Sequence, residues 1–239
     1  MATITTEACL MKPAQNLSAQ GLLSLLHLSS PALPVGAFAY SQGLEYALDS
    51  CWCENREQVQ RWLQDNLQFG VGYLDLPVYA RLHSAWQKNC EQSIQTWNQT
   101  LLAFRETSEL YKEDIQVGSA YAQWHLGQDE SRETYIQQCQ PPTVVAMSAL
   151  AAVLHKIPLD QALLGFCWSW CENQIACASK AMPMGQTDGQ KILQAMIPIM
   201  AEVCEKAQQL QDDEIGTSLF GTALASSLHE HQYSRLFRS

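Results

Sequence analysis

Positive charge is scarce in this chain of 239 residues. It contains 14 lysines and arginines against 24 aspartates and glutamates, which gives a formal net charge of -10. A phosphate backbone requires clustered lysine and arginine, so this composition disfavours nucleic acid as a partner. The acidity is typical of a solvated surface that resists aggregation, and it also suits a basic protein partner or a cation.

Long apolar stretches are also missing. The most apolar stretch, Val144 to Leu154, is too short to cross a bilayer, which requires about 20 apolar residues. Residues 1–15 contain one lysine and no long apolar core, so they lack the features of a secretory signal. We therefore expect a cytoplasmic protein without a membrane span.

Common signatures of catalysis are absent as well. The sequence has no Gly-x-x-x-x-Gly-Lys-Ser/Thr loop to hold phosphates, no Gly-x-Ser-x-Gly nucleophile turn and no His-Glu-x-x-His metal motif. No cysteine and histidine spacing matches a zinc site. We expect that the chain does not hydrolyse GTP, is not an enzyme and has no intrinsic cofactor.

Cysteine, in contrast, is plentiful. The nine cysteines are odd in number, and their spacings match no disulfide framework. Cys167, Cys171 and Cys177 can share one face of a predicted helix, where buried thiols behave as small apolar groups. A place in the core is therefore the favoured interpretation, and metal binding or redox chemistry is the alternative.

The fold class follows from the spacing of apolar residues. Val59, Trp62, Leu63 and Leu67 recur at helical intervals, and no run alternates with the period of two that a strand needs. The chain is predicted to be all-α, a single-domain bundle of about ten helices over residues 21–228, between a flexible segment at 1–20 and a C-terminal docking tail at 229–239. The predicted helices span 21–28, 42–49, 57–69, 74–88, 91–105, 109–126, 131–137, 143–155, 158–181, a stretch from 191 that Pro198 should kink, and 215–228.

The last eleven residues, His229 to Ser239 and hereafter the tail, have an unusual composition for a chain end. Chain ends usually fray and tolerate change. This one contains Tyr233, Arg235, Phe237 and Arg238, residue types that anchor buried protein contacts. The tail is predicted to be a docking element, and a last turn folded onto the protein's own core is the alternative.

A second unusual segment is Ser29 to Glu45, in which two prolines and two glycines interrupt apolar residues. Pro31 and Pro34 must end any helix that precedes them. A loop with so many apolar residues must lie against the core or a partner. Tyr40 and Glu45 can present polar groups from this loop.

The sequence resembles the urease accessory protein UreF family, which consists of helical chaperones of nickel-enzyme maturation. Four blocks carry the resemblance, from about Gly21 onward, and four blocks in order are more specific than any single motif. The blocks are Pro31 to Glu45, Arg105 to Glu109, Trp168 to Asn173 with Lys180, Pro183, Gly185-Gln186 and Gly189-Gln190, and the ending Glu230 to Ser239.

The resemblance implies a non-catalytic adaptor that works as a homodimer. In the family, UreF binds the accessory protein UreH, also called UreD, and the nickel-carrying GTPase UreG. It couples GTP binding and hydrolysis to nickel delivery into apo-urease. Nickel and GTP would therefore be handled by the partners of this chain.

The resemblance also implies two partner surfaces. Lys180, Gln186 and Gln190 are expected to face UreG from a loop between two helices. The residues expected on the UreH/UreD side are Tyr40, Glu230, Gln232, Tyr233, Arg235, Leu236, Phe237 and Arg238. Arg105, Glu106 and Glu109 are predicted to have a structural role through polar contacts.

Two other functions remain open at this point. His229 and His231 are weak candidates for a metal site, because nickel accepts imidazole ligands, but alternate residues of a helix point in different directions. A helical enzyme that depends on thiols or a metal is the first alternative function. A helical adaptor unrelated to urease is the second.

Overall fold

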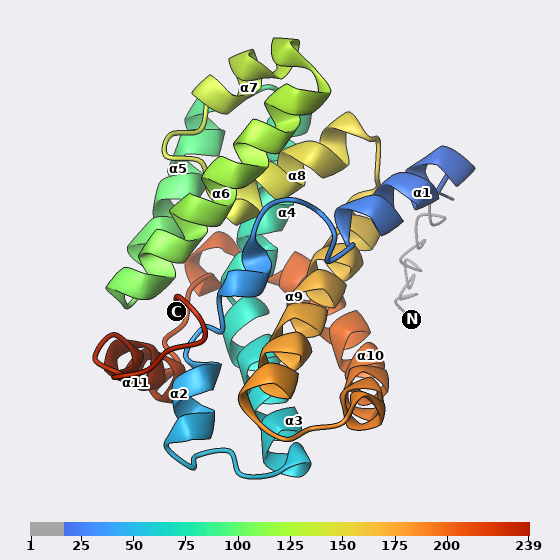
Figure 1. The fold of residues 1–239 in the computed structure, drawn as a ribbon. Coiled ribbons are helices and arrows are strands. Elements are labelled where there is room, and N and C mark those ends of the chain that lie inside the picture. Colours follow the sequence, from blue (N-terminus) through green and yellow to red (C-terminus); the bar gives the residue numbers. More distant parts are fainter. Residues whose placement is uncertain (1–16) are drawn as a thin grey trace, which may run out of the picture.

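The computed structural model describes residues 17–239, in which it has eleven α-helices and no strand (Figure 1). The predicted all-α, single-domain bundle is confirmed. The helices are α1 (Ala19–Leu28), α2 (Leu44–Asp49), α3 (Arg56–Asp65), α4 (Asp75–Gln87), α5 (Glu91–Ala103), α6 (Ser108–Gln128), α7 (Glu133–Gln137), α8 (Val144–Leu154), α9 (Leu159–Ala181), α10 (Gln186–Gln209) and α11 (Phe220–His229). Of the predicted flexible segment at 1–20, residues 1–16 lie outside the described part, and α1 already begins at Ala19.

Side-chain caps explain where several helices begin. The side chain of Asn55 accepts a hydrogen bond from the backbone of Gln58 at the start of α3. Thr107 and Thr143 do the same at the starts of α6 and α8. Such caps satisfy backbone N–H groups that the first helical turn leaves without a partner.

The predicted loop before the tenth helix is wrong in its second half. Gln186 to Gln190 form the first turn of α10, so Gln186 and Gln190 lie on a helix rather than in a connection. A Cβ atom on Gly189 would lie 3.0 Å from Cγ2 of Ile175 on α9. Glycine at this position therefore allows α9 and α10 to approach closely, and it does not mark a turn.

The last helix begins later than predicted. The chain from Ile215 to Leu219 is not helical, and α11 begins at Phe220. Gly216 has a φ of 126°, which a side chain disfavours, and an added Cβ atom would lie 2.3 Å from the ring of Phe104. The backbone conformation of Gly216 is incompatible with a helix, so the helix can begin only after this residue.

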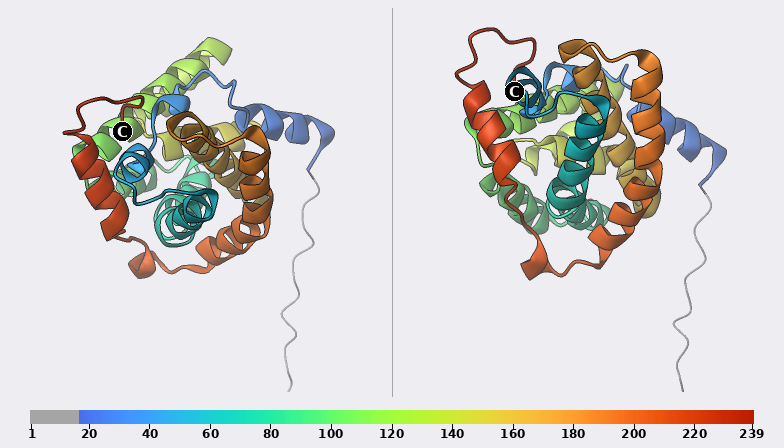
Figure 2. Two further views of the ribbon diagram at one scale, coloured as in Figure 1. Left: turned by 60° about the horizontal axis from the view of Figure 1, so that its bottom comes forward. Right: turned by 90° about the horizontal axis from the view of Figure 1, so that it is seen from below.

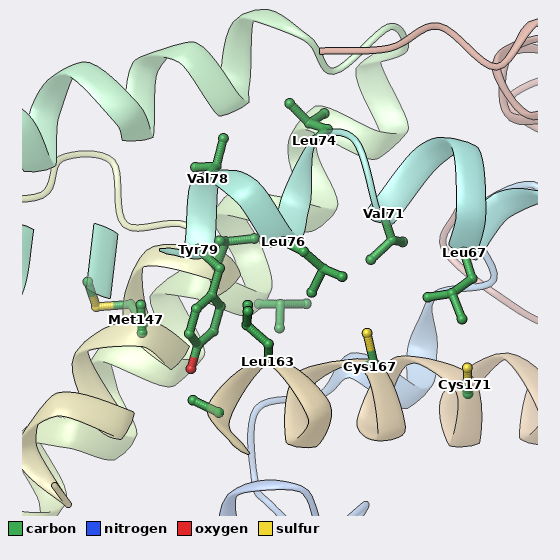
Figure 3. Close-up of a cluster of buried hydrophobic side chains, with 14 of the residues drawn as sticks. Leu67, Val71, Leu74, Leu76, Val78, Tyr79, Met147, Leu163, Cys167 and Cys171 are labelled. Carbon is green, nitrogen blue, oxygen red and sulfur yellow. The ribbon is translucent and has the colours of Figure 1, made fainter. Parts of the chain in front are cut away.

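Helix α4 lies in the middle of the bundle and contacts α5, α8, α9 and α10 (Figure 2). Its inner residues meet α9 in a cluster that includes Tyr79, Leu163, Cys167 and Cys171 (Figure 3). In the described part of the chain, six cysteines are buried among apolar groups: Cys53, Cys139, Cys167, Cys171, Cys177 and Cys204. The predicted core position of Cys167, Cys171 and Cys177 is confirmed.

The alanine-rich helix α8 is buried over most of its length, because its small residues allow α4 and α6 to pack against it. Thr143 at its start also donates a hydrogen bond to Asn98 of α5, and Asn98 donates one to the backbone of Pro141. Among the described residues, no helix is long and apolar enough to span a membrane.

A buried charge cluster joins the end of α5 to α4, α6 and the start of α8. Arg105, just after α5, donates hydrogen bonds to Asp114 of α6 at 2.5 Å and to Asp75 of α4 at 2.6 Å. Asp114 also accepts a hydrogen bond from the backbone of Val144 at the start of α8. Burial alone would lower the pKa of Arg105, but the two carboxylates outweigh it and raise that pKa. The structural role predicted for Arg105 is confirmed.

We predict that Arg105→Met destabilises the protein strongly, because it leaves two buried carboxylates without their cation. The expected loss in the free energy of unfolding is about 3–5 kcal/mol, measured by urea denaturation. Arg61→Met, at an exposed position on α3, is the matched control and should change stability by about 0.5 kcal/mol or less. Equal losses in the two variants would contradict this account.

Candidate functional site

The tail returns to the protein after α11 and lies beside the segment that precedes α2 (Figure 2). The backbone N–H of Arg238 donates to the carbonyl of Ala39 at 2.8 Å, and that of Ser41 donates to the carbonyl of Ser239 at 2.8 Å. The hydroxyl of Ser41 also donates to Ser239. The first and last unusual segments of the sequence are therefore paired in space.

Two carboxylates hold the tail in this position, and we call Glu45 of α2 and Glu109 of α6 the carboxylate clamp. Glu45 accepts hydrogen bonds from the backbone N–H groups of Leu236 at 2.6 Å and Phe237 at 2.9 Å. Glu109 pairs with the guanidinium group of Arg235 at 2.7 Å. Both carboxylates are buried, so their hydrogen bonds to the tail replace those that they would make with water.

His229, at the end of α11, joins the two halves of the clamp. Its Nδ1 lies 2.7 Å from Glu109 and its Nε2 lies 3.0 Å from Glu45, and its side chain is fully buried. Each ring nitrogen lies within hydrogen-bonding distance of one carboxylate, so this side chain links Glu45 to Glu109.

His231 is exposed, whereas His229 is enclosed, so the structure gives the two histidines different environments. Within residues 17–239, no three histidine, cysteine, aspartate or glutamate side chains are arranged to hold a metal ion.

Burial raises the pKa of Cys53 to about 11 and that of Cys139 to about 12, which keeps these thiols protonated near neutral pH and poorly nucleophilic.

The side chain of Phe237 fills a buried position next to α9. The ammonium group of Lys180, in the last turn of α9, lies 5.7 Å from the centre of this ring and 5.8 Å from that of Phe38. Both distances are in the range of cation–π contacts. Lys180 is therefore in contact with the tail and with the apolar loop.

Tyr40 is buried and does not present its side chain to a partner. Its hydroxyl donates to Gln116 of α6 at 2.6 Å, and its carbonyl accepts from Asn173 of α9 at 3.1 Å. The expectation that Tyr40 is a surface contact is wrong, because the apolar loop around it packs on the protein's own helices.

The tail is not only a docking element, because part of it belongs to the core. His229, Phe237 and Ser239 are buried, so removal of the tail would remove part of the core. For these three residues the alternative prediction is correct, in which the end of the chain folds onto the protein's own core. The rest of the tail forms an exposed arch over residues 230–236, in which Leu236 is 67% exposed and Tyr233 is fully exposed.

The other tail residues that were expected to contact a partner are exposed or half-buried. Glu230 and Arg238 are exposed, and Arg235 is 40% exposed while its guanidinium group pairs with Glu109. Gln232 is half-buried and donates to the carbonyl of Ser234 at 2.9 Å within the arch. The structure thus brings Lys180 to the tail, while Gln186 and Gln190 are exposed on the first turn of α10.

A third carboxylate lies where the tail ends. Glu113 of α6 accepts hydrogen bonds from Gln42 and from the hydroxyl of Ser239, both at 2.7 Å. Burial raises the pKa of Glu113 to about 7, although these two donors oppose the shift. Glu113 also lines a partly open cavity of about 260 Å³, together with Asp75, Arg105 and Asp114.

Sequence reasoning identified the tail but missed what holds it. It named Glu45 only as a group that the apolar loop could present, and it assigned no role to Glu113. Glu109 was grouped with Arg105, whereas its partners come from α11 and the tail. The pairs that these carboxylates form with α11 and the tail join residues more than 100 positions apart, and no local pattern marks them.

We predict that Glu45→Ala loosens the tail and destabilises the protein. The change leaves His229 and two backbone N–H groups without their acceptor, so the free energy of unfolding should fall by about 2–4 kcal/mol. Hydrogen exchange should accelerate at residues 236–238. The control is Glu202→Ala, at an exposed position of α10. Unchanged stability and exchange in Glu45→Ala would contradict the clamp.

We also predict a pH effect from Glu113. Because its pKa is raised from 4.5 to about 7, the folded state binds a proton more tightly than the unfolded state does. The contribution of this group to stability is therefore complete below pH 4.5 and is lost as the pH rises to about 7. Glu113→Gln removes this titration. Relative to the wild type, its stability in urea should increase between about pH 5 and pH 8, and a difference independent of pH would refute the assignment.

The chain is similar to known proteins over most of its length. The family model for UreF matches residues 53–197. The urease accessory protein UreF of Teredinibacter turnerae is 48% identical over 219 residues, which cover 91% of this chain and 98% of the relative. Those of Hahella chejuensis and Pseudoalteromonas translucida are 46% and 42% identical over 221 and 231 residues, covering 91% and 95% of this chain and 98% of each relative. The chain belongs to the UreF family of urease accessory proteins.

Proposed function

We propose that this protein is a non-catalytic adaptor that bridges a UreH/UreD-type protein and a UreG-type GTPase. Membership of an accessory-protein family implies a part in urease maturation. The observation that carries the finer proposal is the arch at residues 230–236. It exposes an aromatic and a large aliphatic side chain while the buried clamp holds the tail at both ends of the arch.

The arch is the proposed contact with the UreH/UreD-type partner. Tyr233 and Leu236 are large side chains that lose water on binding, and residues of this kind dominate many interfaces. Glu230 and Arg238 add charges of opposite sign at the edge of the same segment. The buried tail residues support the arch from below and do not touch the partner.

The start of α10 is the proposed contact with the GTPase. Gln186 and Gln190 lie four residues apart on one helical face, and both are exposed. Lys180 adds an exposed ammonium group six residues earlier in the sequence. In this proposal nickel is cargo and GTP is a substrate of the partner, and this chain favours one state of the GTPase by binding it better than the other.

A second copy of the chain is the proposed occupant of the outer face of α1. This helix projects from the bundle, and it exposes Leu22, Leu23 and Leu26 by 48%, 67% and 59% (Figure 1). Three exposed leucines on a ten-residue helix form an apolar stripe that pairing would cover. The homodimer is therefore proposed to form through α1.

We predict that Tyr233→Ala and Leu236→Ala weaken binding of a UreH/UreD-type partner without unfolding the protein. Each anchor residue is worth about 2 kcal/mol, which is roughly a thirtyfold change in affinity. Calorimetric titration measures the affinity, and thermal unfolding should show almost no change because both side chains are exposed. The matched control is Trp52→Ala, which truncates an aromatic that is 38% exposed between α2 and α3. Wild-type affinity in both tail variants would exclude the arch as the contact.

A further inference from the structure

Buried thiols meet between α9 and α10, in a part of the core that the proposed function does not use. Cys167 and Cys171 lie one turn apart on α9 (Figure 3), and Cys204 comes from the second half of α10. The sulfur atoms of Cys167 and Cys204 lie 3.5 Å apart. Both side chains are almost fully enclosed, at 0% and 3% exposure. Two thiols from different helices therefore face each other in direct contact.

Covalent geometry favours this pair over its neighbour. A disulfide needs Cβ atoms about 3.5–4.5 Å apart, whereas residues four apart on a helix have Cβ atoms about 5–6 Å apart. Cys167 and Cys171 therefore cannot be joined while α9 remains helical. Cys167 and Cys204 need only a small movement of their side chains, because their sulfur atoms are already in contact.

The folded structure keeps these thiols from reacting quickly. The hydrogen bond with Cys204, together with burial, raises the pKa of Cys167, and burial raises the pKa of Cys171. An enclosed, protonated thiol is a poor nucleophile. A reagent in solution can therefore reach the pair only when one of the two helices opens locally.

Helix α10 is the one that opens more readily. Pro198 lies inside it and has no N–H group with which to bond to the carbonyl of Gln194, so the backbone hydrogen bonding of the helix is interrupted there. Cys204 lies in the half of α10 that follows this interruption. Local opening of that half exposes Cys204 first.

We propose that Cys167 and Cys204 form a site of reversible oxidation, at which a low-molecular-weight disulfide such as glutathione disulfide converts the two thiols into a bond between α9 and α10. The thiolate of Cys204 attacks the reagent, which forms a mixed disulfide and releases one thiol. The thiolate of Cys167 then attacks the sulfur of Cys204 and releases the second thiol. The two cysteines lose two electrons and two protons, and the reagent is reduced to two thiols.

The bond changes the energetics of the helix pair. It joins residues 37 positions apart and closes a loop that contains the connection between α9 and α10. A cross-link of this kind restricts the unfolded chain and so favours the folded state. It also ties the half of α10 beyond Pro198 to α9, which suppresses the opening that admitted the reagent.

The first test maps the bond in the full-length protein. The chain is incubated with glutathione disulfide, its remaining thiols are blocked, and it is unfolded and digested without reduction. Trypsin places the two cysteines on separate peptides, 157–180 and 192–206. Mass spectrometry should find these peptides linked in the wild type and in Cys171→Ala, but not in Cys167→Ala or Cys204→Ala. Cys171→Ala is the matched control, because it removes another buried thiol from the same face of α9.

The second test measures thermal unfolding of each variant before and after oxidation. The bond should raise the Tm of the wild type and of Cys171→Ala by about 5–10 °C, and dithiothreitol should reverse the rise. Cys167→Ala and Cys204→Ala lose some core packing, so each is compared with its own reduced form. Their Tm should not rise with the oxidant.

Three results would overturn the proposal. One is the absence of linked peptides in the wild type, both in buffer and in urea below the unfolding transition, where local opening is faster. Another is a cross-link that forms in Cys167→Ala at the wild-type rate and yield, which would assign the partner of Cys204 to another cysteine of α9. The third is a bond that leaves the Tm unchanged or lowers it, because the two thiols would then not be placed for an unstrained disulfide.

Discussion

The carboxylate clamp is the constraint on which the two ends of this protein depend. Glu45 and Glu109 come from different helices, and the groups that they bind come from the last eleven residues. A closed loop of nearly 200 residues has an entropic cost that grows only slowly with length, so a few strong hydrogen bonds can hold it shut. Since the clamp residues are buried, the loss of either one would leave a polar group without a partner.

Several residues in the blocks that resemble the family serve the fold. Tyr40 and Phe237 are buried, and Arg105 closes a charge cluster between α4 and α6. Only part of the tail, around Tyr233 and Leu236, is available for contact. A family pattern therefore combines buried residues, which hold a surface segment in place, with exposed residues, which are part of that surface. The burial of each side chain in the structure separates the two groups.

Helix periodicity predicted the fold because each helix buries one face, which leaves a local pattern in the sequence. The errors came from glycines. Gly189 lies within α10 and allows this helix to pack closely against α9, whereas Gly216 lies in a segment that cannot be helical. The sequence shows the same residue type at both positions and does not distinguish these two roles. The tail was recognised from its aromatic and arginine residues, but its partners Glu45, Glu109 and Glu113 lie far away in the sequence. Long-range pairs of this kind have no periodic signal, so only the folded structure could reveal them.

A clamped tail changes the energetics of docking. A free tail would have to be ordered on binding, at a cost of about 2–5 kcal/mol that reduces its affinity. Here the clamp fixes both ends of the arch, so a partner in the proposed complex would have to order only the side chains of residues such as Tyr233 and Leu236. In the proposed complex, the buried ion pairs and hydrogen bonds beneath the arch would contribute to binding without touching the partner. Changes in the clamp should therefore affect affinity and stability together, whereas changes in the arch should affect affinity alone.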